Sequence, residues 1–230
     1  NGGNAAEYTN GVSLHAISGL SYSEKAFCAS GVASIIRDSA RGFVGSGMVS
    51  IIGNKATGMQ ASGFMNYTAH QVKGMQAAGF LNMAGDITGV QAAGFANIVT
   101  NNVTGVQAAG FINVANTATS QAAGFINLSD TNKSQVAGFI NIANYTQGAQ
   151  VAGFANVANN VEGTQVAGFI NIAHKVKGAQ ISGFINIADS CDYPIGLINL
   201  IKKGVKAFGI MTDLKGTTFV TFRSGGRVLY

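Results

Sequence analysis

Hydrophobic and polar positions along this chain follow one recurring unit, Gln-x-Ala-Gly-Phe-x-Asn, which returns at a step of 14 to 16 residues. The Gln positions are Gln60, Gln76, Gln91, Gln107, Gln121, Gln135, Gln150, Gln165 and Gln180. The Phe positions are Phe64, Phe80, Phe95, Phe111, Phe125, Phe139, Phe154, Phe169 and Phe184. The Asn positions are Asn66, Asn82, Asn97, Asn113, Asn127, Asn141, Asn156, Asn171 and Asn186. Self-similarity at a fixed period predicts a stacked repeat fold.

The period of the unit predicts strands rather than helices. It is too short for two helices with their turns, whereas about 15 residues at roughly 3.3 Å each form one coil with two short strands and two corners. Apolar and polar or small residues alternate within each unit, and Gly stands at a fixed place where the backbone must bend or approach a neighbour. The sequence therefore predicts an all-β fold, a parallel β-solenoid of about 12 or 13 coils with a C-terminal antiparallel β-hairpin cap.

The two ends of the array depart from the unit, as expected for capping repeats. Before Gly63 the unit decays to traces such as 31–34 and 47–50, in which Ser replaces Asn. After Asn199 the period becomes two, over 205–212 and 217–223, with turn signals between them and a third strand expected from Arg227 to Tyr230. We therefore divide the chain into an N-terminal cap (1–18), a solenoid domain (19–200) and a C-terminal antiparallel cap (201–230).

The repeated residues predict structural ladders along the stack. Aligned amides can hydrogen-bond from coil to coil, and aligned aromatic rings can stack. In a straight strand the Gln, Phe and Asn of one unit share a face, and the aliphatic residues between them share the other. Either the chain bends at the Gly and changes faces, or one outer face is apolar and covered by a partner. We favour Phe in the core, with Phe on a partner-covered face as the alternative.

Charge is scarce and unevenly placed. Charged residues are 10% of the chain, and residues 1–201 hold eight basic and eight acidic side chains. The formal net charge of +5 arises from six Lys or Arg and one Asp in residues 202–230. Because the repeats are neutral, the basic stripe typical of nucleic-acid binding is missing. The basic C-terminal segment is a solvated cap or, alternatively, associates with an outer membrane.

Candidate chemistry is sparse in this sequence, and we predict no catalytic, cofactor-binding or metal-binding residue. His15, His70 and His174 are far apart in register and are expected to be surface residues. Cys28 and Cys191 are too many coils apart for a disulfide and are predicted to be free thiols. We also expect no two acidic or histidine side chains to meet in a deep pocket within 63–199.

The unit Gly-x-Gln-x-Ala-Gly-Phe-x-Asn, as in 148–156, and the closing segment Asp189–Asn199 resemble bacterial surface-repeat proteins of a type found in Bacteroidetes and spirochaetes. The resemblance covers about residues 30–230. This chain departs from it by using Ala-Gly-Phe where a shorter Gly-Leu is frequent. The resemblance implies export to the bacterial outer membrane or cell surface and no enzyme activity, and it carries over no functional residues.

Together these observations predict a non-enzymatic cell-envelope repeat protein that acts as a scaffold or binding element. One alternative is an adhesin-like module for a glycan or a protein partner, and self-association into a homo-oligomer is a further expectation. Another alternative is a β-helical enzyme that acts on polysaccharides. Such enzymes carry long acidic loops on one face, whereas the corners here are short.

Overall fold

The computed structural model describes residues 7–212 and 216–225, and all of its regular structure is β. In the first half the strands are β1 (Thr9–His15), β2 (Ser18–Ser21), β3 (Ser23–Ser30), β4 (Ala33–Ile36), β5 (Ala40–Ser46), β6 (Val49–Ile52), β7 (Lys55–Ser62), β8 (Met65–Ala78), β9 (Leu81–Ala93) and β10 (Ala96–Val99). The second half contains β11 (Asn102–Ala109), β12 (Ile112–Ala123), β13 (Ile126–Ala137), β14 (Ile140–Ala152), β15 (Ala155–Ala167), β16 (Ile170–Ser182), β17 (Ile185–Ile195), β18 (Ile198–Ile201), β19 (Lys206–Thr212) and β20 (Thr218–Ser224).

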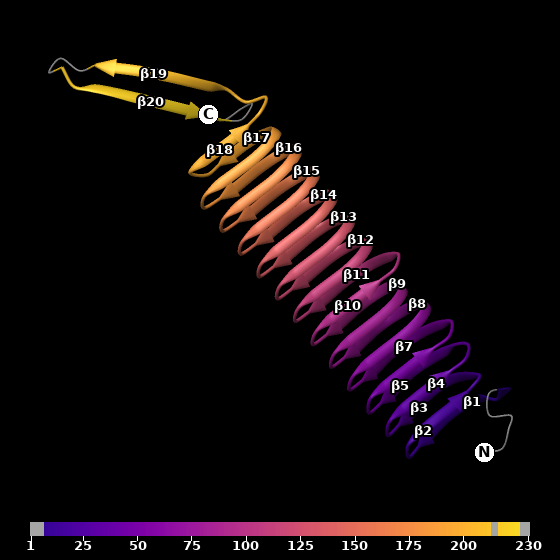
Figure 1. Cartoon of the computed structure of the whole chain (residues 1–230). Coiled ribbons are helices and arrows are strands. Elements are labelled where there is room, and N and C mark those ends of the chain that lie inside the picture. Colours follow the sequence, from indigo (N-terminus) through magenta and orange to yellow (C-terminus); the bar gives the residue numbers. More distant parts are fainter. Residues whose placement is uncertain (1–6, 213–215, 226–230) are drawn as a thin grey trace. The chain divides into compact units, whose positions relative to one another are not determined.

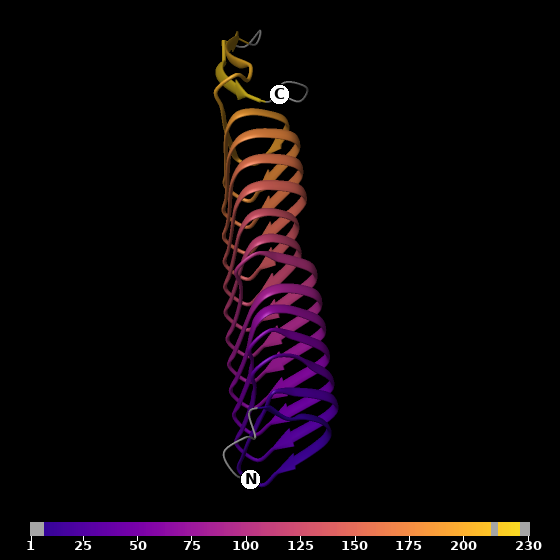
Figure 2. The ribbon, with the colours of Figure 1, turned by 90° about the vertical axis from the view of Figure 1, so that its right-hand side faces the viewer.

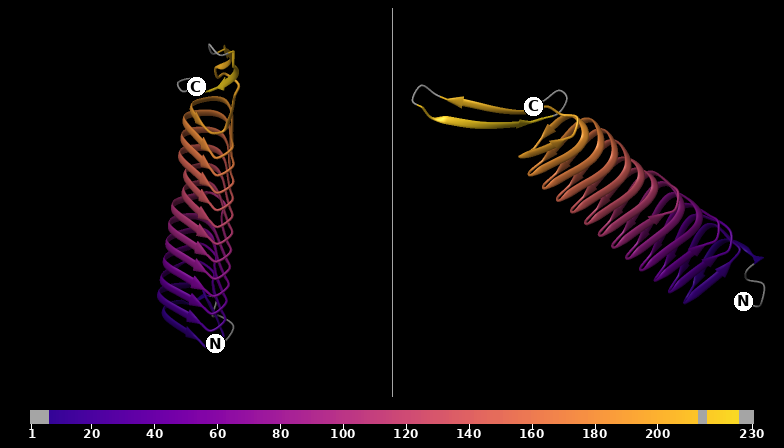
Figure 3. Two further views of the ribbon diagram at one scale, coloured as in Figure 1. Left: turned by 90° about the vertical axis from the view of Figure 1, so that its left-hand side faces the viewer. Right: turned by 45° about the horizontal axis from the view of Figure 1, so that its top comes forward.

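Strands β1 to β18 wind into a parallel β-solenoid of about 13 coils, as the sequence predicts. The chain divides into two compact units, an N-terminal unit (1–130) and a C-terminal unit (131–230). Within each unit, strands of successive coils run side by side (Figures 1, 2 and 3). Within the predicted N-terminal cap, β1 already pairs in parallel with β3, so the stack begins at Thr9.

Like residues stack on like residues in this register. In the C-terminal unit, β14 pairs with β15 so that Asn141 lies against Asn156 and Gln150 against Gln165. In the N-terminal unit, β8 pairs with β9 with the same alignment. The repeat spacing therefore becomes columns of identical side chains along each unit.

The Gln and Asn columns form hydrogen-bonded ladders inside the coils, where nearly every member is fully buried. Each Gln Nε2 donates to the Gln Oε1 of the preceding coil, at 2.8–3.0 Å in the N-terminal unit and 2.8–2.9 Å in the C-terminal unit. Each Asn Nδ2 donates in the opposite direction, to the Asn of the following coil, at 2.8–3.0 Å. Because the two ladders run in opposite directions, their amide dipoles oppose each other.

The amides also join the two walls of each coil. Gln76 Nε2 donates to the Met83 carbonyl at 3.2 Å, and Asn82 Nδ2 donates to the Ala92 carbonyl at 2.6 Å. A buried amide is costly unless its hydrogen bonds are made. The ladders meet that requirement along their length, and only Asn66 Oδ1 and Gln180 Oε1, at the two ends, are buried ladder oxygens without a partner among the described residues. This explains why a polar interior is stable.

Apolar columns fill the remaining interior. Val72, Ile87 and Val103 are buried in the N-terminal unit, and Val161 and Val176 are buried in the C-terminal unit. Cys191 continues the second of these columns, in register with Val176. The interior of each coil is therefore part amide ladder and part aliphatic core.

Glycine precedes Phe in the unit because the coils touch there through their backbones. A Cβ on Gly94 would lie 2.1 Å from the carbonyl oxygen of Gly79, and the same approach recurs along both units. No side chain fits in that space. The chain bends at this Gly–Phe pair, which turns the next side chain outward.

The expectation that Phe lies in the core is therefore wrong. Phe64, Phe80, Phe95, Phe111, Phe125, Phe154, Phe169 and Phe184 are 36–46% exposed, and Phe139 is half-buried. In a straight strand Phe would share the inward face with Gln and Asn, but the bend at Gly–Phe places its ring on an outer corner. The chain therefore bends at the Gly, and the rows of aliphatic residues between them also face outward. Coverage of that face by a partner stays a prediction.

The C-terminal segment forms a separate two-stranded antiparallel sheet of β19 and β20, with Lys206 opposite Ser224 and Thr212 opposite Thr218. The predicted antiparallel character is confirmed. The third strand expected at 227–230 and most of the turn at 213–216 lie outside the described residues. Phe208, Ile210 and Val220 of the hairpin are strongly exposed.

Candidate functional site

Two features of the described residues stand out from the regular repeat. One is the stacked Phe corner on the outside of each unit, and the other is a cluster of His15, Glu24 and Cys28 inside the first coils.

The Phe corner, defined as the outward Phe column of each unit, is a continuous stack of rings. In the N-terminal unit neighbouring ring centroids lie 4.8–5.0 Å apart with interplanar angles of 1–12°. In the C-terminal unit the centroids lie 4.9–5.1 Å apart at 4–15°. The spacing follows from the coil-to-coil distance of a parallel sheet, about 4.8 Å.

Outward rows flank the Phe corner on both walls, and they are more apolar in the C-terminal unit. There Val136, Val151 and Ile181 are exposed on one side, and Ile142 and Ile172 on the other. In the N-terminal unit the first of these rows is mostly Ala, at Ala61, Ala77, Ala92, Ala108 and Ala122. The C-terminal unit therefore presents a broader aliphatic and aromatic face.

Polar side chains occupy the corners away from the Phe. Lys177 Nζ lies 2.8 Å from Glu162 Oε1, and both side chains are exposed. This contact, together with a hydrogen bond to Tyr145, lowers the pKa of Glu162. Such exposed pairs contribute little to stability. They give this edge a charged, water-facing surface that contrasts with the Phe corner.

His174 and Asp189 meet at the C-terminal end of the coils, on the rim of a hollow of about 450 Å³. His174 Nδ1 lies 3.3 Å from Asp189 Oδ2, and Lys202 Nζ lies 3.9 Å from Asp189 Oδ1. The side chains of His174 and Asp189 are 71% and 45% exposed. His174 is thus a surface residue, as predicted, and its acidic neighbour lies on an open surface rather than in a deep pocket.

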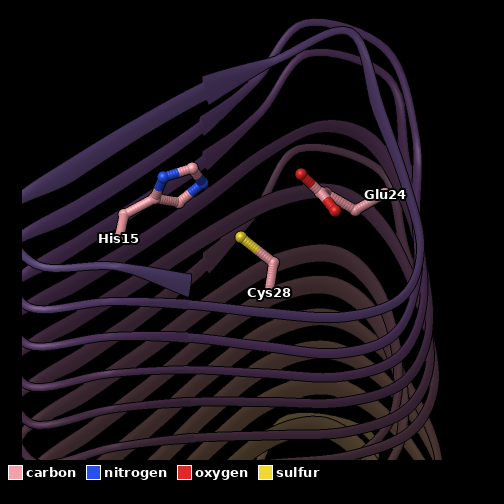
Figure 4. A group of neighbouring side chains, drawn as sticks. All are labelled: His15, Glu24 and Cys28. Carbon is pink, nitrogen blue, oxygen red and sulfur yellow. The ribbon is translucent and has the colours of Figure 1, made fainter. Parts of the chain in front are cut away.

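His15 does not match its predicted role as an isolated surface residue. His15 on β1 and Glu24 and Cys28 on β3 each offer one ligand atom, and these atoms all lie within 4.8 Å of one another. Figure 4 shows the three side chains pointing toward a common point inside the first coils. Glu24 and Cys28 are buried, and His15 is partly buried.

Each member of this cluster replaces a different kind of residue in its column. Glu24 pairs with Asn10 in the preceding coil and with Ala40 in the following one, and its column continues with Ala56, Val72, Ile87 and Val103. Cys28 pairs with Val44, which pairs with Gln60, so Cys28 occupies a Gln-ladder position. His15 pairs with Ser30 at the head of the small-residue column Ser30, Ser46, Ser62 and Ala78.

Gly19 provides the space for the imidazole ring of His15. It heads the column of Ser34, Ser50 and Asn66, so later coils carry a side chain where Gly19 has none. A Cβ on Gly19 would lie 2.0 Å from the Cδ2 and 2.3 Å from the Nε2 of His15. The ring therefore fills the place that the Asn ladder occupies in later coils.

Hydrogen bonds hold the Glu24 carboxylate in place. Ser13 Oγ lies 2.9 Å from both carboxylate oxygens, and Asn10 Nδ2 donates to Oε1 at 3.1 Å. Glu24 forms no ion pair with any residue that the structure describes. Burial raises the pKa of the Cys28 thiol, hydrogen bonding to Ser34 opposes that effect, and the negative charge of Glu24 adds to it.

The sequence contains a signal that would have located this cluster. Ser30, Ser46 and Ser62 each stand directly before a Gly, at a step of 16 residues. Stepping back 15 residues from Ser30 reaches His15, and stepping back 16 from Ala40 reaches Glu24. If the degenerate first coils are assigned to the same columns, instead of treating 1–18 as a cap without a repeat pattern, His15 and Glu24 fall in the interior of the solenoid.

Comparison with known proteins adds no function to this picture, because no family model, curated protein or solved structure matches the chain. A search for apolar helices of membrane-spanning length finds none among the described residues.

Proposed function

We propose that this chain is a non-enzymatic repeat protein of the bacterial cell envelope that serves as a scaffold and presents its Phe corner for binding. The observation that carries the proposal is the outward Phe stack in each unit. Its rings repeat at 4.8–5.1 Å with their faces aligned and are about two-fifths exposed. The fold of the coils does not require an aromatic residue at this corner, because Val32 and Met48 stand at the same position in earlier coils.

A scaffold role accounts for the interior. Successive coils contact only their neighbours, so a solenoid gains a long surface without a large core. The amide ladders fix the register of every coil, because a shift by one residue would remove all of their hydrogen bonds. The outer face of the stack therefore presents its rows at a constant spacing.

The Phe corner favours a protein partner over a glycan. Contiguous exposed aromatic and aliphatic rows are typical of interaction sites. Glycans need several directional hydrogen bonds from the surface that binds them, whereas the rows beside the Phe corner of the C-terminal unit are Val and Ile. Envelope location rests on the resemblance to bacterial surface-repeat proteins.

The test uses the purified chain and a variant in which Phe154 and Phe169 are both changed to Ser. The intact chain serves as bait on envelope extracts from cells that produce it, alongside a glycan array. We expect one protein to be retained by the wild-type chain and lost with the variant, with no glycan signal. A matched variant, Lys175→Ser with Lys177→Ser on the polar corner, should retain the partner.

Two other outcomes would overturn parts of the proposal. If the wild-type chain binds a glycan and the Phe154→Ser, Phe169→Ser variant does not, the ligand of the Phe corner is a sugar rather than a protein. Surface proteolysis of intact cells tests location separately: a chain that is cleaved only after lysis would contradict an exposed envelope protein.

A further inference from the structure

We propose that His15, Glu24 and Cys28 form a binding site for one zinc ion inside the first coils of the solenoid. This inference is independent of the function proposed for the Phe corner. It rests on the kinds of ligand brought together, on their departure from the interior columns, and on the missing counter-charge of a buried carboxylate.

The donor set matches zinc. An imidazole nitrogen, a thiolate sulfur and a carboxylate oxygen are the three ligand types that zinc takes in proteins. Calcium and magnesium prefer oxygen ligands alone, so a thiol and an imidazole argue against them. Three protein ligands leave a fourth tetrahedral position for water.

The present geometry is close to that of a tetrahedral site. The three ligand atoms lie within 4.8 Å of one another. Donors bound to zinc at roughly 2.0–2.3 Å would stand about 3.5 Å apart. Shortening the distances between the ligand atoms to this value takes side-chain movements of about 1 Å. The His15 ring is free to make such a movement, because it forms no hydrogen bond to any described residue.

The buried carboxylate supplies a second observation. Glu24 is 1% exposed, its hydrogen-bond partners are a hydroxyl and an amide, and it forms no ion pair with any described residue. Buried carboxylates in proteins are normally paired with a cation or coordinate a metal. A zinc ion between Glu24, His15 and Cys28 would provide that charge.

The columns show that the fold does not demand these residues. The position of Glu24 is filled by Ala, Val or Ile in the following coils, and that of His15 by Ser or Ala. A glycine then stands where the ring needs room, at Gly19. A ligand role gives one reason for these three departures and for Cys28 in the column of the Gln ladder.

Binding would also fasten the start of the stack. His15 belongs to β1, whereas Glu24 and Cys28 belong to β3, so one ion would join two successive coils where no Gln or Asn ladder is present. On binding, the Cys28 thiol releases its proton to water and its sulfur forms the bond to zinc.

The experiment titrates the metal-free, untagged chain with Co²⁺ as a spectroscopic substitute for zinc, and then displaces it with Zn²⁺. We expect one ion per chain, with the thiolate-to-cobalt charge-transfer absorption of a tetrahedral site. Cys28→Ser should abolish this absorption. His15→Ala and Glu24→Gln should weaken metal affinity by roughly tenfold or more.

Gly19→Ala is the sharpest variant, because it keeps all three ligand residues in the sequence and displaces only the ring of His15. It should weaken metal affinity too. The controls are Cys191→Ser, the other buried thiol, and His174→Ala, the other histidine beside a carboxylate. Both should bind metal as the wild-type chain does, and circular dichroism checks that every variant is folded.

A second measurement needs no variant of the cluster. Zinc should raise the thermal midpoint of the wild-type chain as its concentration rises, and magnesium should not. The proposal is overturned if the wild-type chain shows no thiolate absorption with saturating cobalt, or if that absorption persists in Cys28→Ser. Equal affinity in the wild-type chain and Glu24→Gln would remove Glu24 from the site.

Discussion

The buried side chain of Gln180 lies in register with Pro194, so the Gln ladder of the C-terminal unit ends at a residue with no amide to donate. Gln180 Nε2 still donates to Gln165 at 2.9 Å. Its Oε1, however, is buried without a hydrogen-bond partner. A ladder of this kind leaves one end unsatisfied unless the next coil supplies an amide.

Pro194→Gln should therefore stabilise the C-terminal unit. The new amide would stand where every regular coil has one and would donate to Gln180 Oε1, for a gain of about 1 kcal/mol. Urea denaturation measures the effect. Pro194→Leu is the matched control, because it removes the proline ring but adds no amide. A gain of the same size in both variants would show that the proline, rather than the missing amide, limits stability.

A substitution inside the Gln ladder should lower the free energy of unfolding by more than the missing amide at its end does. Gln107 donates to Gln91 at 2.9 Å and accepts from Gln121 at 2.8 Å. Gln107→Leu would leave one buried acceptor and one buried donor without partners, and we expect a loss of roughly 2 to 5 kcal/mol. Val106→Ala, on the exposed neighbouring residue, should change stability by about 0.5 kcal/mol or less. Similar urea midpoints for the two variants would contradict a structural role for the ladder.

The repeat itself made the coils, their number and the amide ladders predictable, because identical residues at a fixed step must fall into columns. The direction of the Phe was not predictable from the same pattern. Gln, Phe and Asn share one parity, and only the backbone contact at Gly94 and its equivalents turns the chain between them. The His15 cluster was missed because the first coils lack the Gln, Phe and Asn that mark the columns.

The outward placement of Phe makes a distinct prediction about polar replacements. Phe95 is 40% exposed on the corner, whereas Ile87 is fully buried in the aliphatic column. Phe95→Ser and Phe95→Ala should differ in stability by about 0.5 kcal/mol or less, since water can reach the new hydroxyl. Ile87→Ser should be less stable than Ile87→Ala by about 1 to 3 kcal/mol, because its hydroxyl would be buried without a partner. Thermal or urea unfolding of the four variants measures these differences. A large difference in stability between Phe95→Ser and Phe95→Ala would show that the Phe95 side chain is buried in the core.

The buried thiol of Cys191 predicts a loss of stability at high pH. Burial raises the pKa of Cys191 from its ordinary value of 9.0 to about 11. Between pH 9 and pH 11 the unfolded chain loses this proton while the folded chain keeps it, so ionisation favours the unfolded state. The urea midpoint should fall more over this range in the wild-type chain than in Cys191→Val, which matches the Val161 and Val176 of the same column. Parallel curves for the two proteins would show that the thiol does not ionise on unfolding.

The C-terminal segment is expected to keep solenoid ends apart. The last coil ends with the short strand β18, and open strand edges invite pairing with another chain. Residues 202–230, which follow that coil in the sequence, carry six Lys and Arg and one Asp and so account for the formal net charge of +5. Deleting 205–230 removes the hairpin and four of these charges, so the truncated chain should self-associate, as measured by light scattering after size-exclusion chromatography. Raising the salt concentration should increase association of the intact chain, because salt screens the repulsion between the same charges. The Debye length shrinks to about 3 Å near 1 M salt, so exposed charges then repel each other only weakly. A truncated chain that remains monomeric would show that the hairpin does not cap the stack.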